Sequence, residues 1–296
     1  MTRAGFVAVI GAPNAGKSTL VNALVGQKVA IVSDKAQTTR ARLMGIAIAG
    51  EAQLLLVDTP GIFVPRRRLD RAMVAAAWTG AADADLALLV IDAATGINAQ
   101  VERIVASLEE RRPRLILALN KIDLVRKADL LALAAALTER LGPQAVFMIS
   151  ATQGDGVADV KAALAHAVPE GPWLYPADEV SDATDRMVAA ELTREQIYLQ
   201  LYQELPYSAA VETEQWEDRP DGSAAIHQQI LVERDSQKAI VIGKGGSRLK
   251  RIGAAAREEI ARHLGRPVHL FVHVKVNPKW DEDRALYKDI GLEWAD

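Results

Sequence analysis

Residues 11–18 read Gly-Ala-Pro-Asn-Ala-Gly-Lys-Ser, with the residue types and spacing that can hold a phosphate chain. Gly11 and Gly16 let the backbone curl around an anion with no Cβ in the way. Lys17 would reach the β- and γ-phosphate oxygens, and the Ser18 hydroxyl would bind a magnesium ion. We therefore expect a nucleoside triphosphate here. The expected contacts come from Gly11, Ala12, Pro13, Asn14, Ala15, Gly16, Lys17, Ser18 and Thr19.

The flanking sequence predicts the elements that this chemistry needs. The apolar run 6–10 predicts a buried strand, and residues 19–24 predict a helix. Successive backbone N–H groups and the positive end of that helix would face the same phosphates. A plain glycine-rich turn is the alternative, which the strand, the helix and the Lys-Ser pair together disfavour.

A second cluster, Asp58-Thr59-Pro60-Gly61, follows the apolar run 53–57. An acidic residue at the carboxyl end of a buried strand suits a magnesium site, usually through a water. The Gly61 N–H would bond the γ-phosphate and sense its loss on hydrolysis. The expected nucleotide contacts are Asp58, Thr59, Pro60, Gly61 and Ile62.

The third cluster, Asn120-Lys121-Ile122-Asp123, indicates which base is bound. The Asp123 carboxylate can accept from both N1–H and N2–H of guanine, whereas adenine would leave buried acceptors unsatisfied at about 1–3 kcal/mol each. Asn120 would brace the base and the neighbouring loops, and the Lys121 stem would pack on the ring plane. The Ala151 N–H, between Ser150 and Thr152, would donate to guanine O6. The pattern favours GTP and argues against an ATPase.

The elements between these clusters indicate an α/β domain. Continuous apolar strands are expected at 85–92 and 114–119, which is typical of a parallel sheet covered on both faces. Residues 43–49 and 53–57 predict a hairpin, 145–149 a further strand, and 101–111 and 127–141 helices. Together the motifs resemble the GTPase superfamily over residues 1–165. Ras-type GTPases orient the attacking water with a glutamine after the DxxG motif, and Ile62 cannot do so, so we expect slow intrinsic hydrolysis.

A change of composition marks a domain boundary. Three prolines and a glycine between 169 and 182 preclude a continuing helix, and Trp173, Leu174 and Tyr175 are expected to pack on a domain face. The predicted domains are a nucleotide-binding domain at 1–168, a linker at 169–182 and a second domain at 183–296. In the second domain we expect a helix over 185–204, strands at 209–215 and 225–232, and a last strand at 268–276.

The second domain holds a GxxG turn, Gly243-Lys244-Gly245-Gly246, between an apolar helix end and a new helix. Six basic residues and no acidic one lie between 236 and 257. This is the signature of a KH module, whose glycines let a nucleic-acid backbone approach closely. The element order matches the type II topology. The candidate RNA-binding residues are Lys238, Gly243, Lys244, Gly245, Gly246, Arg248, Lys250 and Arg251.

The predicted fold class is therefore α/β, a P-loop GTPase domain with a mostly parallel sheet, followed by a smaller α+β KH (type II) domain. The chain has 296 residues, no cysteine and a net charge of −3, so thiolate metal sites and disulfides are excluded and any RNA surface is a local patch. No apolar stretch approaches a membrane span. We expect a cytoplasmic monomer.

A GTPase followed by a KH module resembles one family closely, the Era GTPases. The resemblance covers 11–19, 35–40, 58–61 and 120–123, and in the second domain 204–208, 230–234, 241–246 and 274–280. It implies a bacterial GTPase for maturation of the 30S ribosomal subunit, whose KH domain binds the 3′ end of 16S ribosomal RNA. It also implies peripheral association with the inner membrane.

The resemblance further implies that Thr39, rather than Thr38, closes on magnesium. We accordingly expect Ser18, Thr39 and Asp58 as magnesium ligands, and Lys17, Thr39 and Gly61 as catalytic residues. GTP with Mg²⁺ would order residues 37–42 and 61–69, and hydrolysis would release them.

Three alternatives stay open. The second domain could dock proteins instead of RNA, or the protein could modify RNA, although no catalytic cluster stands out there. Asn14 could coordinate a potassium ion near the α- and γ-phosphates, or only stabilise its loop.

Overall fold

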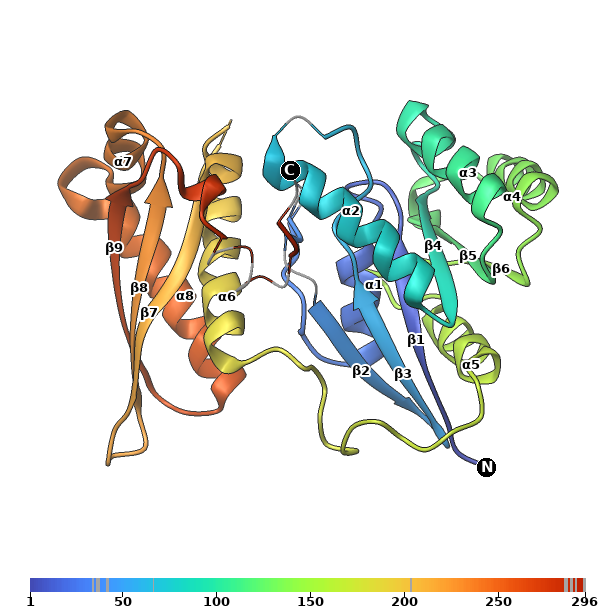
Figure 1. The fold of residues 1–296 in the computed structure, drawn as a ribbon, viewed down its shortest axis with the longest axis horizontal. Helices are drawn as coiled ribbons and strands as arrows, with labels where there is room; N and C mark the ends of the chain where they lie inside the picture. Colours follow the sequence, from blue (N-terminus) through green and yellow to red (C-terminus); the bar gives the residue numbers. More distant parts are fainter. Residues whose placement is uncertain are drawn as a thin grey trace. The chain divides into compact units, whose positions relative to one another are not determined.

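The computed structural model describes residues 1–33, 35, 38–40, 43–65, 67–202, 204–284, 287, 290 and 292–294. The described chain forms two compact units, Met1–Asp182 and Ala183–Trp294 (Figure 1). Each unit has its own sheet and its own hydrophobic core, so the two are described separately.

The first unit is built on a six-stranded sheet with the strand order β2-β3-β1-β4-β5-β6. Strand β2 is antiparallel to β3, and all other neighbours are parallel. The mostly parallel sheet is thereby confirmed. The strands are β1 (Arg3–Ile10), β2 (Leu43–Ala49), β3 (Ala52–Asp58), β4 (Leu86–Asp92), β5 (Leu115–Asn120) and β6 (Ala145–Met148).

Helices cover both faces of this sheet, because both faces of the central strands are apolar. Val7 and Val9 of β1 pack with helices α1 (Lys17–Val25) and α5 (Val157–Ala167). Ala8 and Ile10 point to the opposite face. That face is covered by α2 (Arg68–Asp83), α3 (Ala99–Arg111) and α4 (Lys127–Leu141).

Helices α2 and α5 are elements of this unit that the sequence patterns did not predict. Residues 61–69 were expected to be a nucleotide-controlled loop, and the alanine-rich stretch after it has a weak apolar stripe. Small residues such as Ala77 and Ala81 bury α2 against the sheet. At the N-terminus, the Arg67 N–H donates to the Asp70 carboxylate at 3.0 Å.

Residues 169–182 lie against the hairpin of β2 and β3. The side chain of Gln53, which is fully buried, donates to the Tyr175 carbonyl at 2.8 Å and accepts from the N–H groups of Leu174 and Tyr175 at 2.8 and 3.0 Å. The Ile46 N–H donates to the Val180 carbonyl at 2.8 Å. The segment is therefore held against β2, the edge strand of the sheet. This strand begins directly after the predicted switch segment 37–42.

We predict that Gln53→Leu loosens this segment and destabilises the first unit. Leucine has similar volume but leaves two N–H groups and a carbonyl without partners, at a cost of about 1–3 kcal/mol for each group that stays buried. Some of these groups can regain a partner, because the segment can move into water. We therefore expect a total loss of about 3 kcal/mol in the free energy of unfolding, near the low end of the sum for three groups. Urea denaturation and limited proteolysis within 169–182 measure the effect.

The control for this variant is Glu51→Ala. Glu51 is exposed, and its carboxylate bonds the N-terminal amine in a solvent-exposed pair, whereas the contact with Trp173 uses the Glu51 carbonyl. An exposed ion pair contributes little. Equal stability and equal protease resistance of Gln53→Leu and wild type would contradict the prediction.

The second unit has the order helix, two strands, two helices, strand, which confirms the predicted KH topology. It comprises α6 (Asp185–Gln200), β7 (Ala209–Asp218), β8 (Ala224–Val232), α7 (Asp235–Ile242), α8 (Ser247–Leu264) and β9 (Val268–Val276). In the sheet order β7-β8-β9, β8 is antiparallel to β7 and parallel to β9. Ile230, Val241 and Ile252 belong to the core between this sheet and the helices.

The prediction that the first helix of this unit runs to Glu204 is wrong. Helix α6 ends at Gln200, and a short 3₁₀ turn at Leu205–Ser208 contains Pro206. Leu201 adopts an extended conformation and is 1 % exposed, because it packs into the core together with Leu205. Tertiary packing therefore ends the helix before the proline does. Among the described helices, none combines the length and apolarity of a membrane span.

Candidate functional site

The predicted phosphate-binding loop joins β1 to α1. Asn14 and Gly16 adopt positive φ values of 63° and 93°, so the backbone turns sharply between the two elements. A Cβ at Gly16 would overlap the amide nitrogen of Asn120, which explains why only glycine fits there. Helix α1 begins at Lys17 with no acidic side chain in its first turn. The loop thus directs a positive helix end toward the space above it.

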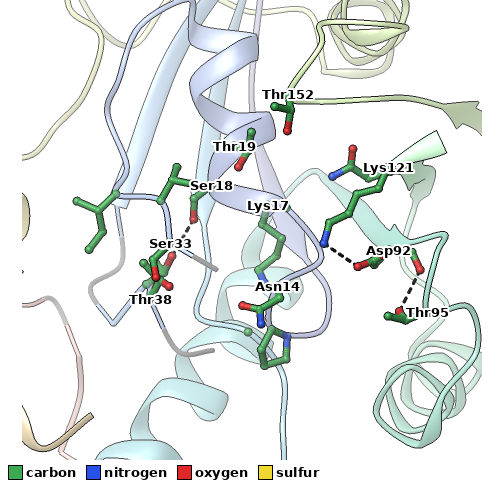
Figure 2. A pocket seen from close by; sticks show the side chains of 17 residues that line it. Asn14, Lys17, Ser18, Thr19, Ser33, Thr38, Asp92, Thr95, Lys121 and Thr152 are labelled. Carbon is green, nitrogen blue, oxygen red and sulfur yellow. Dashed lines mark hydrogen bonds and ion pairs between the residues drawn. The ribbon is translucent and has the colours of Figure 1, made fainter. Parts of the chain in front are cut away.

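That space is a cavity of about 590 Å³ (Figure 2). It brings together residues from three of the predicted motifs, together with the polar segment before β2. Among the predicted site residues, those that line it are Pro13, Asn14, Gly16, Lys17, Ser18, Thr19, Thr39, Gly61, Asn120, Lys121 and Thr152.

Lys17 lies at the floor of the cavity. Its ammonium donates to the carbonyls of Ala12 and Gly11 at 3.0 and 3.4 Å. Burial lowers the pKa of Lys17 to about 8, and the nearby Asp58 carboxylate opposes that shift. Among the described residues the hydrogen bonds of this buried cation go to carbonyls, which suits an anionic ligand, because a phosphate would supply further negative charge.

Ser18, Thr39 and Asp58 form one cluster beside Lys17. The Ser18 hydroxyl donates to Asp58 Oδ2 at 2.7 Å and lies 2.8 Å from the Thr39 hydroxyl, which is itself 3.2 Å from Asp58 Oδ2. The second carboxylate oxygen, Oδ1, is buried without a hydrogen-bond partner in the described part of the chain. Burial raises the pKa of Asp58, against the influence of Lys17, Ser18 and Thr39. Three hard oxygen donors and an unpaired buried oxygen fit Mg²⁺.

The two candidate threonines differ in their surroundings. Thr38 donates to the Lys35 carbonyl at 2.7 Å, and Thr39 is buried against Ser18 and Asp58. The geometry thus favours Thr39 as the magnesium ligand. Of the expected switch segment 37–42, positions 37, 41 and 42 lie outside the described residues.

Gly61 and Ile62 lie against the phosphate-binding loop. A Cβ at Gly61 would come within 2.9 Å of the Pro13 nitrogen, and the Ile62 N–H donates to the Gly11 carbonyl at 3.0 Å. The Ile62 side chain is buried in the core beneath α2 and does not line the cavity. It offers nothing that could orient a water, as the sequence predicts.

Asn120 connects the loops at the other end of the cavity. Its amide donates to the Ala15 carbonyl at 2.9 Å, and its side-chain oxygen accepts from the Ala151 N–H at 3.0 Å. If the predicted bond to guanine forms, the Ala151 N–H would be shared between the Asn120 side-chain oxygen and guanine O6. Asp123 lies in the exposed turn Ile122–Leu124, outside the cavity lining.

Other predicted residues support the cavity from behind. The Thr59 hydroxyl, for example, donates to the Val9 carbonyl at 2.7 Å and joins the ends of β3 and β1. In addition to Asp123, the predicted contacts that do not line the cavity are Gly11, Ala12, Ala15, Asp58, Thr59, Pro60, Ile62, Ser150 and Ala151.

Sequence reasoning missed Asp92 as a site residue. The Lys121 ammonium donates to Asp92 Oδ2 at 2.7 Å, and the Thr95 hydroxyl donates to the Asp92 carbonyl at 3.1 Å (Figure 2). This pair fixes the Lys121 stem, on which the base ring is expected to pack. The available signal was that Asp92 ends a buried strand, as Asp58 does. Ile31, Val32 and Ser33 also line the cavity.

In the second unit the GxxG turn joins α7 to α8. Gly243 has φ 72°, and a Cβ there would come within 2.8 Å of Arg248 Cβ. Arg248 donates to the Ile240 carbonyl at 2.7 Å, and Arg251 donates to Gln200 at 2.9 Å, so both arginines also brace the turn and its helix.

The remaining RNA candidates are open to solvent to different degrees. Lys244, Gly245 and Lys250 are exposed, and Lys238 and Gly246 are partly exposed. The turn therefore presents backbone N–H groups and cations at one helix start, which suits a phosphate backbone.

Both units are similar to known protein families. Residues 6–121 match the family described as 50S ribosome-binding GTPase, and residues 204–281 match the KH domain family. GTPase Era of Erythrobacter litoralis is 56 % identical over 299 residues, which covers 100 % of this chain and 98 % of the relative. GTPase Era of Afipia carboxidovorans is 57 % identical, with 99 % and 95 % covered.

Two solved structures are similar over nearly the whole chain. One is Era in complex with MgGDPNP and nucleotides 1506–1542 of 16S ribosomal RNA, with 36 % identity and a TM-score of 0.93. The other is a point variant of Aquifex aeolicus Era bound to GDP·AlF4⁻, with 36 % identity and a TM-score of 0.92. Each alignment covers 98 % of this chain and 99 % of the other.

Proposed function

Because this chain belongs to the Era family of GTPases, we propose that it couples GTP hydrolysis to binding of 16S ribosomal RNA during maturation of the 30S subunit. The observation that carries the proposal is the pairing of a phosphate-and-base cavity in one unit with an exposed GxxG turn in the other. A similar protein, Era bound to MgGDPNP and a fragment of 16S ribosomal RNA, supports both halves.

We assign nucleotide binding to residues 1–168 and RNA binding to residues 183–296, with 169–182 as the connecting segment. In the first part, the loop N–H groups hold the phosphates and Lys17 neutralises the charge that develops on them. Ser18, Thr39 and Asp58 would hold Mg²⁺, which would supply further positive charge next to the phosphates. The Gly61 N–H bonds the γ-phosphate.

The nucleotide state would control the segments next to this site. GTP with Mg²⁺ holds Thr39 and Gly61, and loss of the γ-phosphate releases both. Thr39 precedes β2, on whose edge residues 169–182 are held, and this supports transmission of the state toward the second unit. GTP would thus act as a timer for RNA association.

Potassium is a further cofactor that we propose for this site. Asn14 lines the cavity near Lys17 (Figure 2), and its side-chain oxygen could hold a cation close to the phosphates. Such a cation would supply positive charge next to the phosphates, which the Ile62 side chain cannot do. We expect faster GTP turnover in K⁺ than in Na⁺ at equal ionic strength.

Asn14→Gly separates this role from a purely structural one. Glycine accepts the positive φ of Asn14 but has no side-chain oxygen, so the loop keeps its shape while the ligand is lost. The variant should hydrolyse GTP equally slowly in both salts. If wild type already shows identical rates in K⁺ and Na⁺, the potassium proposal is wrong.

We also propose that the protein is a cytoplasmic monomer that associates peripherally with the inner membrane. The family resemblance supports the membrane part. Sedimentation of the purified protein tests the oligomeric state, and fractionation of cells with a high-salt wash tests the membrane association. A protein that needs detergent for release would contradict peripheral binding.

The proposed function is tested by equilibrium binding of the full chain to RNA from the 3′ end of 16S ribosomal RNA. Binding is compared with Mg²⁺ and a non-hydrolysable GTP analogue, with Mg²⁺ and GDP, and with a scrambled RNA. We expect tighter binding in the analogue state and a preference for the ribosomal sequence. Equal affinity in both nucleotide states would contradict the timer, and no RNA binding would leave the protein-docking alternative.

A further inference from the structure

The sheet of the second unit has one face covered by helices and one face that is partly open. On β9, Val272 and Val274 pack into the core, whereas His269, Phe271 and His273 point the other way and are exposed. Phe271 is 48 % exposed, although phenylalanine is among the residues that are most often buried. We call His227, His269, Phe271, His273 and Lys275 the aromatic face.

A stacked pair of rings forms the centre of the aromatic face. His227 of β8 is the register partner of Phe271, and their ring centroids are 4.6 Å apart with the planes 17° from parallel. One face of Phe271 is thereby held by His227. Because β9 is the last strand of the sheet, the other ring face points toward the sheet edge, where no strand follows among the described residues. A fixed, exposed ring with one open face is a stacking platform.

Charge changes across this sheet in one direction. Strand β9 carries His269, His273 and Lys275 and no acidic residue, and β8 carries no Asp, Glu, Lys or Arg. The acidic residues lie on β7, at the opposite edge, where Glu214 approaches His273 at 3.6 Å and Glu217 is exposed. A polyanion would therefore meet the Lys275 cation and no carboxylate of β9 itself, and it would be repelled from β7. A basic protein segment would prefer the β7 side, away from Phe271.

The GxxG turn follows helix α7, whose Val241 packs on the covered face of the sheet, so RNA leaving the turn would have to pass the edge of β9 to reach the aromatic face. Helix α7, which ends at the turn, packs against β9 and β8 (Figure 1). A GxxG turn clamps about four nucleotides, so a longer strand must leave it on one side. The edge of β9 offers the Lys275 cation and an aromatic ring to the nucleotides that follow.

We propose that Phe271, backed by His227, stacks on a base of single-stranded RNA that extends beyond the nucleotides held at the GxxG turn. The proposal rests on RNA binding by this domain and adds a second contact that lengthens the RNA site. Stacking of a base on an aromatic ring tolerates different bases. The aromatic face would thus raise affinity for longer RNA rather than define its sequence.

The test compares RNA lengths on the full chain with a non-hydrolysable GTP analogue. Phe271→Ala should weaken binding of a ten-nucleotide RNA about tenfold or more and leave a four-nucleotide RNA unchanged. Phe271→Trp should keep wild-type affinity for both. The control Leu174→Ala, at another exposed apolar side chain in the first unit, should change neither. Photo-crosslinking with 5-iodouridine placed outside the four central nucleotides should label Phe271.

Each other outcome overturns the proposal in a distinct way. Equal affinity of Phe271→Ala and wild type for the long RNA removes the stacking contact. Equal weakening for both lengths means that the ring only supports the GxxG turn. A photo-crosslink to β7 instead of Phe271 would place the RNA at the other edge of the sheet. A protein, and not RNA, that binds at Phe271 would assign the aromatic face to another partner. If the wild-type protein itself binds neither RNA, the proposed function is wrong, and not only the stacking contact.

Discussion

Asp123→Asn is expected to change the nucleotide preference of the first unit from GTP to XTP. The carboxylate can accept two hydrogen bonds from guanine, whereas asparagine presents an N–H donor to one of them. This one mismatch leaves two N–H donors without an acceptor, one on guanine and one on asparagine, and at about 1–3 kcal/mol each this predicts a loss of GTP affinity of about a hundredfold or more. Xanthine has a carbonyl at C2 that accepts from the new donor, so XTP binding should rise. Competition binding with GTP, GDP, XTP and ATP measures the change.

The structure makes this substitution a clean one. Asp123 is exposed in a short turn, and no described residue bonds its carboxylate. The substitution should therefore change the stability of the fold very little. Asp159→Asn, at an exposed position on α5, is the matched control and should leave the preference unchanged. An unchanged nucleotide preference in Asp123→Asn would show that the base is recognised elsewhere.

Lys244→Asp combined with Gly245→Asp should abolish RNA binding and spare GTP hydrolysis. The two carboxylates stand where phosphate has to pass, and each lost phosphate contact should reduce the log–log salt slope by about 0.7. Basal hydrolysis should stay near the wild-type rate, because the residues assigned to it lie before Thr152. Filter binding over a salt series and phosphate release measure the two properties.

Folding should survive this double substitution. Lys244 is exposed, and a Cβ at Gly245 meets no heavy atom within 4 Å. Gly245 has φ 60°, a conformation that aspartate tolerates better than most residues. Lys127→Asp combined with Ala128→Asp, at two exposed positions on α4, matches the change of net charge of the double variant. A folded double variant that keeps its RNA affinity and salt slope would rule out the GxxG turn as the RNA site.

Much of the nucleotide site could be predicted from sequence, because its residues occur in short motifs at strand ends. Gly11, Lys17, Asp58 and Asn120 follow or end parallel strands, and parallel strands bring such positions to one edge of a sheet. The cluster of Ser18, Thr39 and Asp58 is harder, because Thr39 comes from a loop. Only the family resemblance distinguished it from Thr38.

The features that sequence reasoning missed depend on contacts between distant segments. The role of Asp92 exists only because β4 and β5 are neighbours, which brings Lys121 within 2.7 Å. The end of α6 depends on packing of Leu201, and the burial of Gln53 depends on a segment far along the chain. Local patterns do not contain these distances. The stacking of His227 on Phe271 likewise follows from the register between β8 and β9.

Crosslinking of the protein to RNA in living cells, followed by sequencing of the attached RNA, tests the central proposal most directly. We predict that the tags concentrate at the 3′ end of 16S ribosomal RNA and that the Lys244→Asp, Gly245→Asp double variant loses them. The Asp123→Asn variant should have fewer tags as well, since its affinity for GTP is reduced. Tags spread evenly over cellular RNA, or unchanged in the double variant, would contradict a GTPase that binds 16S ribosomal RNA through its KH domain.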